Sequence, residues 1–155
     1  MIILFPDLEQ WRRVFPSEKS LIVTNGCFDV LHSGHCRYLQ EAKSLGDYLL
    51  VGINSDSSVR QIKGQGRPVT RESDRAFVLD SLRCVDAVCI FDSIKADKFL
   101  ALVKPDTYVK GGDYTLDSLD REEKKVLEVN GSRIVLSRFE KGLSTTNILE
   151  KINRL

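Results

Sequence analysis

The strongest constraint on the fold of this chain is a short polar stretch, residues 24–35, with the sequence TNGCFDVLHSGH. It follows the apolar run of residues 21–23 and precedes a segment in which apolar residues recur at helical spacing. A buried strand, a tight polar turn and a helix start therefore follow one another directly. This is how a phosphate-binding helix N-terminus is built in α/β proteins. Both histidines of the chain, His32 and His35, lie in this turn.

Apolar runs with strand character alternate with amphipathic helical segments from residue 20 to the end of the chain. The predicted strands cover residues 20–24, 48–53, 86–91, 107–109 and 133–136. The predicted helices cover residues 34–45, 72–82, 94–103, 119–130 and 144–152, and residues 61–69 are predicted to be an exposed loop. This alternation predicts a single α/β domain with a Rossmann-like, doubly wound parallel sheet of about five strands.

The first residues of the chain have helical character of their own. Apolar side chains recur at helical spacing over residues 7–18, between Pro6 and Pro16. We therefore expect residues 1–19 to form an N-terminal helical extension packed on the core, and residues 20–155 to form the main domain.

Composition excludes several classes of protein. The 155 residues include 23 basic and 22 acidic side chains, a net charge of +1, whereas a nucleic-acid-binding protein carries a clear basic excess. The apolar residues 1–5 are too short for a secretory signal peptide, and no apolar run reaches membrane-spanning length. The four cysteines form no CxxC pair, so we expect reduced thiols in a cytoplasmic protein. From the charge and the apolar runs we expect binding to neither nucleic acid nor membrane.

Polar clusters follow four of the predicted strands, at residues 32–35, 54–56, 110–113 and 138–146. The carboxyl ends of parallel strands lie at one edge of a sheet, and ligands bind there. We therefore expect these segments to meet and to form one site.

The first of these clusters favours a phosphate ligand. His32 and His35 can lie on one side of a helix start, and Gly34 between them leaves room for a phosphate to approach the backbone. The imidazoles, the free N–H groups of the first turn and the helix dipole all favour an anion, which suits phosphoryl or nucleotidyl transfer. In the plainer alternative, both histidines are ordinary turn and helix-start residues. A zinc site that adds Cys27 and Cys36 is weaker still because its spacing fits no usual zinc pattern, and we predict no protein-bound metal.

Two segments resemble the signatures of the cytidylyltransferase-like nucleotidyltransferases. Residues 26–35, GCFDVLHSGH, are similar to the GxFDxxHxGH signature. Residues 142–148, GLSTTNI, are similar to the second signature, which closes over the nucleotide triphosphate. Arg75 at a helix start and residues 109–114, VKGGDY, lie between them at matching distances. The resemblance covers residues 20–153 and implies an HxGH-type nucleotidyltransferase fold and activity.

Within that family the chain most resembles the adenylyltransferase domain of bacterial ADP-heptose synthases, over residues 24–29, 63–69, 109–114 and 144–148. The resemblance implies transfer of AMP from ATP to D-glycero-β-D-manno-heptose 1-phosphate. The products would be pyrophosphate and ADP-heptose, a precursor of the lipopolysaccharide core. It also implies Mg²⁺ with the ATP, and a homodimer. In many bacteria this domain is fused to a sugar kinase, and we expect the present chain to be the stand-alone form.

The same resemblance implies roles for individual residues. The catalytic residues would be His32, His35 and Lys43. The nucleotide would contact Asn25, Gly26, Cys27, Phe28, Gly34, Arg75, Lys110, Gly111, Asp113, Ser144, Thr145 and Thr146. The sugar phosphate would contact Asp29, Asn54, Asp56, Lys63 and Arg67. Some of these residues have a plainer interpretation. Asp29 would then cap a turn, Lys43 would be a solvated lysine on a helix surface, and the hydroxyls of residues 144–146 would form an ordinary helix cap.

Other functions are compatible with the two signatures, because these do not separate ATP from CTP. A glycerol 3-phosphate cytidylyltransferase or an FAD synthetase is the alternative within the enzyme class. Residues 110–114, KGGDY, favour the heptose substrate. The alternative of another class is a nucleotide-binding module without turnover, which the two intact signatures disfavour.

Overall fold

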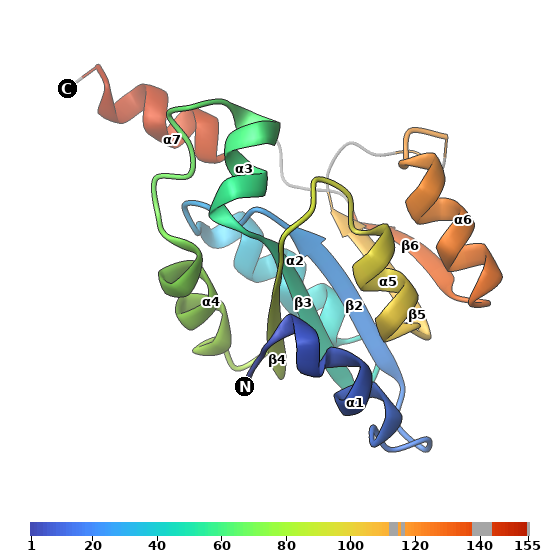
Figure 1. The fold of residues 1–155 in the computed structure, drawn as a ribbon. Helices are drawn as coiled ribbons and strands as arrows, with labels where there is room; N and C mark the ends of the chain where they lie inside the picture. The colour runs from blue at the N-terminus through green and yellow to red at the C-terminus, as the bar shows by residue number, and fades with distance from the viewer. Residues whose placement is uncertain (112–114, 116, 138–143, 155) are drawn as a thin grey trace.

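The computed structural model describes residues 1–111, 115, 117–137 and 144–154. Within these residues, six parallel strands form one sheet in the order β1-β4-β3-β2-β5-β6 (Figure 1). The strands are β1 (Ile2–Ile3), β2 (Leu21–Gly26), β3 (Tyr48–Asn54), β4 (Ala87–Phe91), β5 (Thr107–Gly111) and β6 (Arg133–Ser137). The parallel, doubly wound α/β fold predicted from the alternation is therefore confirmed, with one strand more than expected.

Helices cover both faces of the sheet. They are the 3₁₀ helix η1 (Phe5–Asp7) and the α-helices α1 (Leu8–Arg13), α2 (Ser33–Lys43), α3 (Asp56–Lys63), α4 (Glu72–Asp80), α5 (Asp97–Val103), α6 (Arg121–Val129) and α7 (Thr145–Ile152). Buried side chains of α1, α5 and α6 belong to one core cluster, and those of α2 and α4 belong to the other. Helices α1, α5 and α6 accordingly lie on one side of the sheet, and α2 lies on the other (Figure 1).

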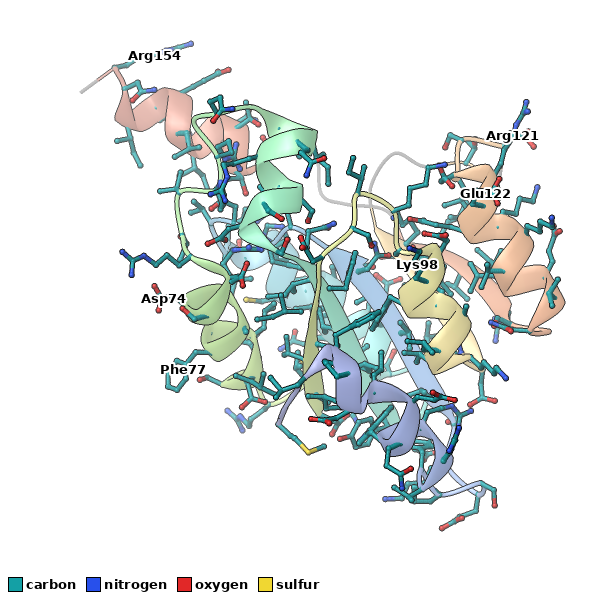
Figure 2. All side chains as sticks on the ribbon, in the orientation of Figure 1. Asp74, Phe77, Lys98, Arg121, Glu122 and Arg154 are labelled. Carbon is teal, nitrogen blue, oxygen red and sulfur yellow. The ribbon has the colours of Figure 1, made fainter. Side chains whose placement is uncertain are left out.

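The period-two alternation of strand side chains supplies both cores. In β2, Leu21 and Val23 face the cluster beneath α5, and Ile22 faces the cluster beneath α2. All three side chains are fully buried, which explains why the strand is a continuous apolar run. On the helices only one stripe is buried: Leu79 of α4 is in the core, whereas Phe77 is 67% exposed and projects from the outer side of α4 (Figure 2).

The N-terminal residues contribute to the sheet. Ile2 pairs with Val88 and Ile3 with Cys89, so that β1 extends the sheet beyond β4. The side chain of Arg12 donates to the carbonyls of Val103 (2.6 Å) and Lys104 (3.2 Å) at the end of α5. These carbonyls have no partner within their own helix, and the guanidinium therefore ties α1 to the domain.

Helix α3 was not expected, because residues 54–56 were described only as a polar cluster after a strand and residues 61–69 were predicted to be an exposed loop. The hydroxyl of Ser55 caps it by accepting from the N–H of Ser58 at 3.1 Å. Its apolar residues are Val59, which is fully buried, and Ile62, and two apolar positions are too few for the sequence pattern to identify a helix. None of the helices among the described residues combines the length and the hydrophobicity that a membrane span requires.

Gly52 in the middle of β3 is required by close packing against α5. A Cβ atom at this position would lie 2.6 Å from Cε1 and 2.8 Å from Cζ of Phe99. We expect Gly52→Ala to lower the free energy of unfolding by about 1–3 kcal/mol because the core cannot take the added methyl group without shifting. Urea denaturation measures the loss. Gly66→Ala is the control, since no atom lies within 4 Å of its Cβ, and an equal loss in both variants would contradict the packing argument.

Candidate active site

The site is organised by a fork between strands β2 and β5. The two strands pair at Ile22–Thr107 and Val23–Tyr108, whereas β2 pairs with β3 along its whole length. The crossovers leave β2 and β5 in opposite directions along the sheet, which makes this gap the topological switch point where ligands of such sheets bind.

Two tyrosines bridge the fork where the backbone pairing ends. The hydroxyl of Tyr38 on α2 is hydrogen-bonded to Thr24 of β2, and it donates to the carbonyl of Val109 on β5 at 2.9 Å. From β5, the hydroxyl of Tyr108 donates to the side-chain oxygen of Asn25 at 2.5 Å. The tyrosines belong to opposite core clusters and therefore hold the fork from both faces of the sheet.

A cavity of about 730 Å³ opens at the fork. It contains most of the residues that the sequence assigned to the site: Asn25, Gly26, Cys27, Phe28, Asp29, His32, His35, Asn54, Lys63, Arg67, Lys110, Gly111, Ser144, Thr145 and Thr146. The polar segments that follow separate strands therefore do meet at one edge. Asp113, and residues 142–143 of the second signature, lie outside the described residues.

The two histidines stand together at the start of α2. Their ring centroids are 3.9 Å apart, and the ring of Phe28 lies 5.3 Å from that of His35. Burial lowers the pKa of His32. Burial, with a smaller contribution from His32, lowers the pKa of His35 to about 4. Both rings are therefore neutral at pH 7, and a neutral imidazole still offers one N–H donor. Nδ1 of His32 is buried without a hydrogen-bond partner among the described residues.

The second signature closes the same cavity. The hydroxyl of Ser144 caps α7 by accepting from the N–H of Asn147 at 3.1 Å. Thr145 donates its hydroxyl to the carbonyl of Val30, two residues before His32, at 3.1 Å. The start of α7 is thereby tied to the loop that carries the histidines. The hydroxyl residues at the N-terminus of α7 therefore line the same cavity as the two imidazoles, an arrangement suited to a polyphosphate.

Asp29 fastens the loop that follows α3 over the cavity. Its carboxylate is buried and accepts from Nε of Arg67 (2.5 Å) and from the backbone N–H groups of Val69 (2.8 Å) and Thr70 (2.9 Å). Burial alone would raise the pKa of Asp29, but the bonds from Thr70, Arg67 and Val69 outweigh it and lower that pKa. The carboxylate therefore stays ionised and orients Arg67, which lines the cavity.

Arg75 was expected to contact the nucleotide, but the structure places it behind the cavity wall. Its side chain is fully buried and donates to the carbonyls of Thr70, Cys27 and Asn54 at 2.5–3.0 Å. It also forms an ion pair with Asp56 at 2.8 Å. Neither Arg75 nor Asp56 lines the cavity at the fork, because the guanidinium is occupied in joining the ends of β2 and β3.

Lys43 lies near the amino ends of the strands, whereas the site lies at their carboxyl ends. Its ammonium donates to Asp86 and to the carbonyl of Asp47, both at 2.6 Å, and these residues directly precede β4 and β3. Helix α2 runs antiparallel to the strands, so eight residues carry the chain about 12 Å away from His35. The assignment of Lys43 to the site is therefore corrected. Gly34 is buried in the first turn of α2 and does not line the cavity.

The cavity also contains polar residues that the sequence analysis did not select: Tyr38, Lys95, Ser118, Asp120 and Glu123. Lys95 and Asp120 form an ion pair of 2.9 Å between the loop before α5 and the cap of α6. Lys95 and Asp120 both come from segments without a recognisable motif. The only sequence feature that could have drawn attention to this part of the cavity is Asp120, an aspartate at the start of the helix predicted over residues 119–130.

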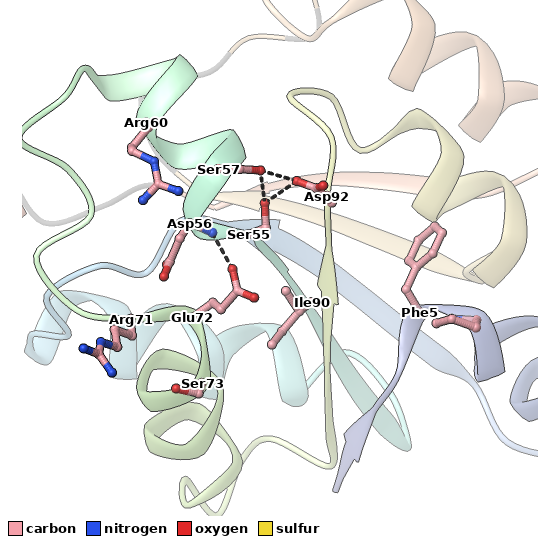
Figure 3. Close-up of a pocket in the computed structure, with 11 residues that line it drawn as sticks. Phe5, Ser55, Asp56, Ser57, Arg60, Arg71, Glu72, Ser73, Ile90 and Asp92 are labelled. Atoms are coloured by element: carbon pink, nitrogen blue, oxygen red, sulfur yellow. Dashed lines mark hydrogen bonds between the residues drawn. The ribbon is translucent and has the colours of Figure 1, made fainter.

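A second concavity of about 750 Å³ lies beside the N-termini of α3 and α4 (Figure 3). The carboxylate of Glu72 accepts from the backbone N–H of Asp56 at 2.5 Å, and Ser55 donates to Asp92 at 2.6 Å (Figure 3). Carboxylates of the chain itself thus occupy the hydroxyl of Ser55 and the backbone N–H of Asp56, and Arg60 and Arg71 also line this concavity. Across the described part of the chain, no three His, Cys, Asp or Glu side chains gather as ligands of one metal ion.

Comparison with known proteins agrees with this geometry. Residues 23–151 match the family model described as Cytidylyltransferase-like. The chain is 49% identical over 136 residues to the bifunctional protein HldE of Geobacter metallireducens, covering 88% of this chain and 27% of that protein. It is 48% identical over 141 residues to HldE of Helicobacter pylori, covering 88% and 28%. The chain therefore spans about a quarter of the length of these relatives.

Solved structures are also similar. A lipopolysaccharide core biosynthesis protein from Thermoplasma volcanium has a TM-score of 0.64 and 30% identity, covering 79% of this chain and 98% of that one. A pantoate-beta-alanine ligase from Francisella tularensis, at 15% identity and a TM-score of 0.62 over 100% of this chain and 79% of that one, shares the fold. The chain belongs to the cytidylyltransferase-like family and is a nucleotidyltransferase.

The depressed pKa of His35 gives the fold an acid sensitivity. The folded value of about 4 lies below the ordinary value of 6.5, so His35 favours folding fully above pH 6.5 and progressively less as the pH falls towards 4. Allowing for its partial exposure, we expect His35→Gln to reduce the loss of stability between pH 7 and pH 5 by about 1–2 kcal/mol. Urea denaturation at both pH values tests this, and an equal pH dependence in the two proteins would contradict it.

Proposed function

We propose that this chain transfers the AMP group of ATP to D-glycero-β-D-manno-heptose 1-phosphate, releasing pyrophosphate and forming ADP-heptose. The observation that carries the proposal is that His32 and His35 share one cavity with Ser144, Thr145 and Thr146. The segments around Lys63 and Lys110 resemble the adenylyltransferase domain of bacterial ADP-heptose synthases. HldE relatives and a structural neighbour described as a lipopolysaccharide core biosynthesis protein support the same substrate.

The reaction is a direct in-line displacement at phosphorus. A phosphate oxygen of the sugar phosphate attacks the α-phosphorus of ATP. The new P–O bond forms as the bond to the β-phosphate bridging oxygen breaks, and pyrophosphate leaves with that electron pair. The attacking group is already an anion, so no covalent enzyme intermediate is needed. Catalysis then consists of positioning the two substrates and stabilising charge on the phosphate oxygens.

The residues of the cavity divide this work between them. The N–H groups of His32 and His35 would donate to the α- and β-phosphates, and the start of α7 would hold the β- and γ-phosphates through hydroxyl and backbone donors. Lys63 and Arg67, on the segment fastened by Asp29, would bind the sugar phosphate. Magnesium would enter bound to ATP, since this ion is commonly held by substrate phosphates and only one or two carboxylates.

We further propose that the protein acts as a homodimer in the cytoplasm. The dimer is supported by the resemblance to ADP-heptose synthases. The cytoplasm is supported by the free thiols of Cys27, Cys36, Cys84 and Cys89, which fit a reducing compartment, and by the need for ATP. Light scattering of the purified chain gives its oligomeric state.

Substrate choice is tested by pyrophosphate release from the purified chain with magnesium. We expect release with ATP and the heptose 1-phosphate, and little with CTP or with glycerol 3-phosphate. Release with CTP and glycerol 3-phosphate would reassign the enzyme to the cytidylyltransferases, and release with ATP and flavin mononucleotide would reassign it to the FAD synthetases. Tight ATP binding without pyrophosphate from any acceptor would indicate a nucleotide-binding module.

The role of the histidine pair is tested by His35→Ala. We expect kcat to fall by about 100- to 1000-fold, because a donor to the transition-state phosphate is lost, while the circular dichroism spectrum stays unchanged. Lys43→Met, at the other end of α2, is expected to retain kcat within about threefold. A folded His35→Ala protein with normal turnover would remove the assigned role, and a large loss in Lys43→Met would restore the role predicted from the sequence.

A further inference from the structure

A line of polar side chains runs along one wall of the cavity, from α6 to β2. Oε2 of Glu123 lies 3.7 Å from Nζ of Lys110. Nζ of Lys110 donates to the hydroxyl of Tyr108 at 3.1 Å, and that hydroxyl donates to Oδ1 of Asn25 at 2.5 Å. Glu123, Lys110 and Asn25 all line the cavity, and Tyr108 is fully buried.

The chemistry of these groups gives the line one direction. An ammonium group can only donate, so the oxygen of Tyr108 accepts from Lys110 and turns its own proton towards Asn25. Asn25 accepts this proton through its carbonyl oxygen, which leaves its amide NH₂ as the group that can donate to a ligand. A positive charge at one end of the line thereby orients a neutral donor at the other. Phosphate oxygens accept hydrogen bonds only, and donors of this kind match them.

Glu123 is held firmly at the start of this line. It is 6% exposed, and its second oxygen, Oε1, accepts from the backbone N–H of Ala96 at the start of α5 at 2.9 Å. Removing a carboxylate and an ammonium from water is costly, and such a pair adds little stability compared with apolar residues of the same size. Fixing the direction of a cation at the edge of a phosphate site is a function that accounts for that cost.

We infer that Glu123 is a positioning residue for nucleotidyl transfer. It aims the ammonium of Lys110 and, through Tyr108, the amide of Asn25 at the phosphate oxygens of the bound substrates. This inference rests on the proposed function and deepens it, because it identifies a residue that acts on the substrates through other side chains.

Glu123→Gln tests the inference with little disturbance. Glutamine keeps the shape of the side chain and an oxygen that can accept from Ala96, and removes the charge that faces Lys110. We expect kcat to fall about tenfold, with the KM for ATP changed less than threefold, because the ammonium still attracts phosphate but is no longer fixed. The matched control is Glu122→Gln, its exposed neighbour at the start of α6 (Figure 2), with kcat and KM unchanged within twofold. Equal kinetics for both variants and the unsubstituted protein would overturn the inference.

A double-mutant cycle separates positioning from a general structural effect. In a Lys110→Met background, Glu123→Gln should have no further effect on kcat, since the group through which it acts is gone. Multiplied losses in the double variant would show that Glu123 acts independently of Lys110 and would overturn the inference. Tyr108→Phe, which removes one oxygen atom from the line and keeps the ring, should lower kcat about three- to fivefold.

A measurement without turnover keeps the inference separate from the proposed reaction. The side-chain amide signals of Asn25 can be observed by nitrogen-15 NMR and assigned by their loss in Asn25→Ser. We expect them to shift in Glu123→Gln and in Tyr108→Phe but not in Glu122→Gln. Unchanged Asn25 signals in the first two variants would disprove the line of contacts whatever the substrate. Absence of pyrophosphate release by the unsubstituted protein would instead reject the proposed function alone.

Discussion

The candidate site depends on the point at which the pairing of β2 with β5 ends, after Val23 and Tyr108. Backbone groups that lose a strand partner inside a protein must find another one. The hydroxyl of Tyr38 supplies it for Val109, and the ring of Tyr38 can reach that position only because residue 111 is glycine: a Cβ there would lie 2.7 Å from Cε2 of the ring. Helix α2, at whose start the two histidines lie, is therefore held against both sides of the fork by one buried side chain.

Most of the cations in the cavity are paired with acids before any substrate arrives. Arg67, Lys95 and Lys110 pair with Asp29, Asp120 and Glu123, respectively, Lys63 lines the cavity as a further cation, and the two histidines are neutral at pH 7. Each acid comes from a different segment than its cation, so every pair also ties a loop or helix to its neighbour. Donors fixed in this way need little rearrangement when a polyphosphate binds, which is the condition for electrostatic catalysis.

The family match begins at residue 23, so that β1 and α1 lie outside it. These elements are nevertheless integral to the sheet and its core, since β1 pairs with β4 and Leu8 is fully buried. The N-terminal residues cover the side of the domain away from the fork. They stabilise the scaffold without entering the cavity, whose lining starts at Asn25.

The sequence by itself determined the alternation of strands and helices, the parallel sheet and the two signatures, because periodicity, capping and motif spacing are local properties of the chain. It also placed His32, His35 and Thr145 correctly at one edge of the sheet. Tertiary structure alone decided that Ile2 and Ile3 add a strand, and that Arg75 supports the wall from behind. It likewise decided that Lys43 faces the far edge and that Glu123 reaches Lys110. Each of these outcomes is a contact between residues distant in sequence, and no local pattern encodes which of several polar side chains near a strand end will find its partner inside the protein and which will face the ligand.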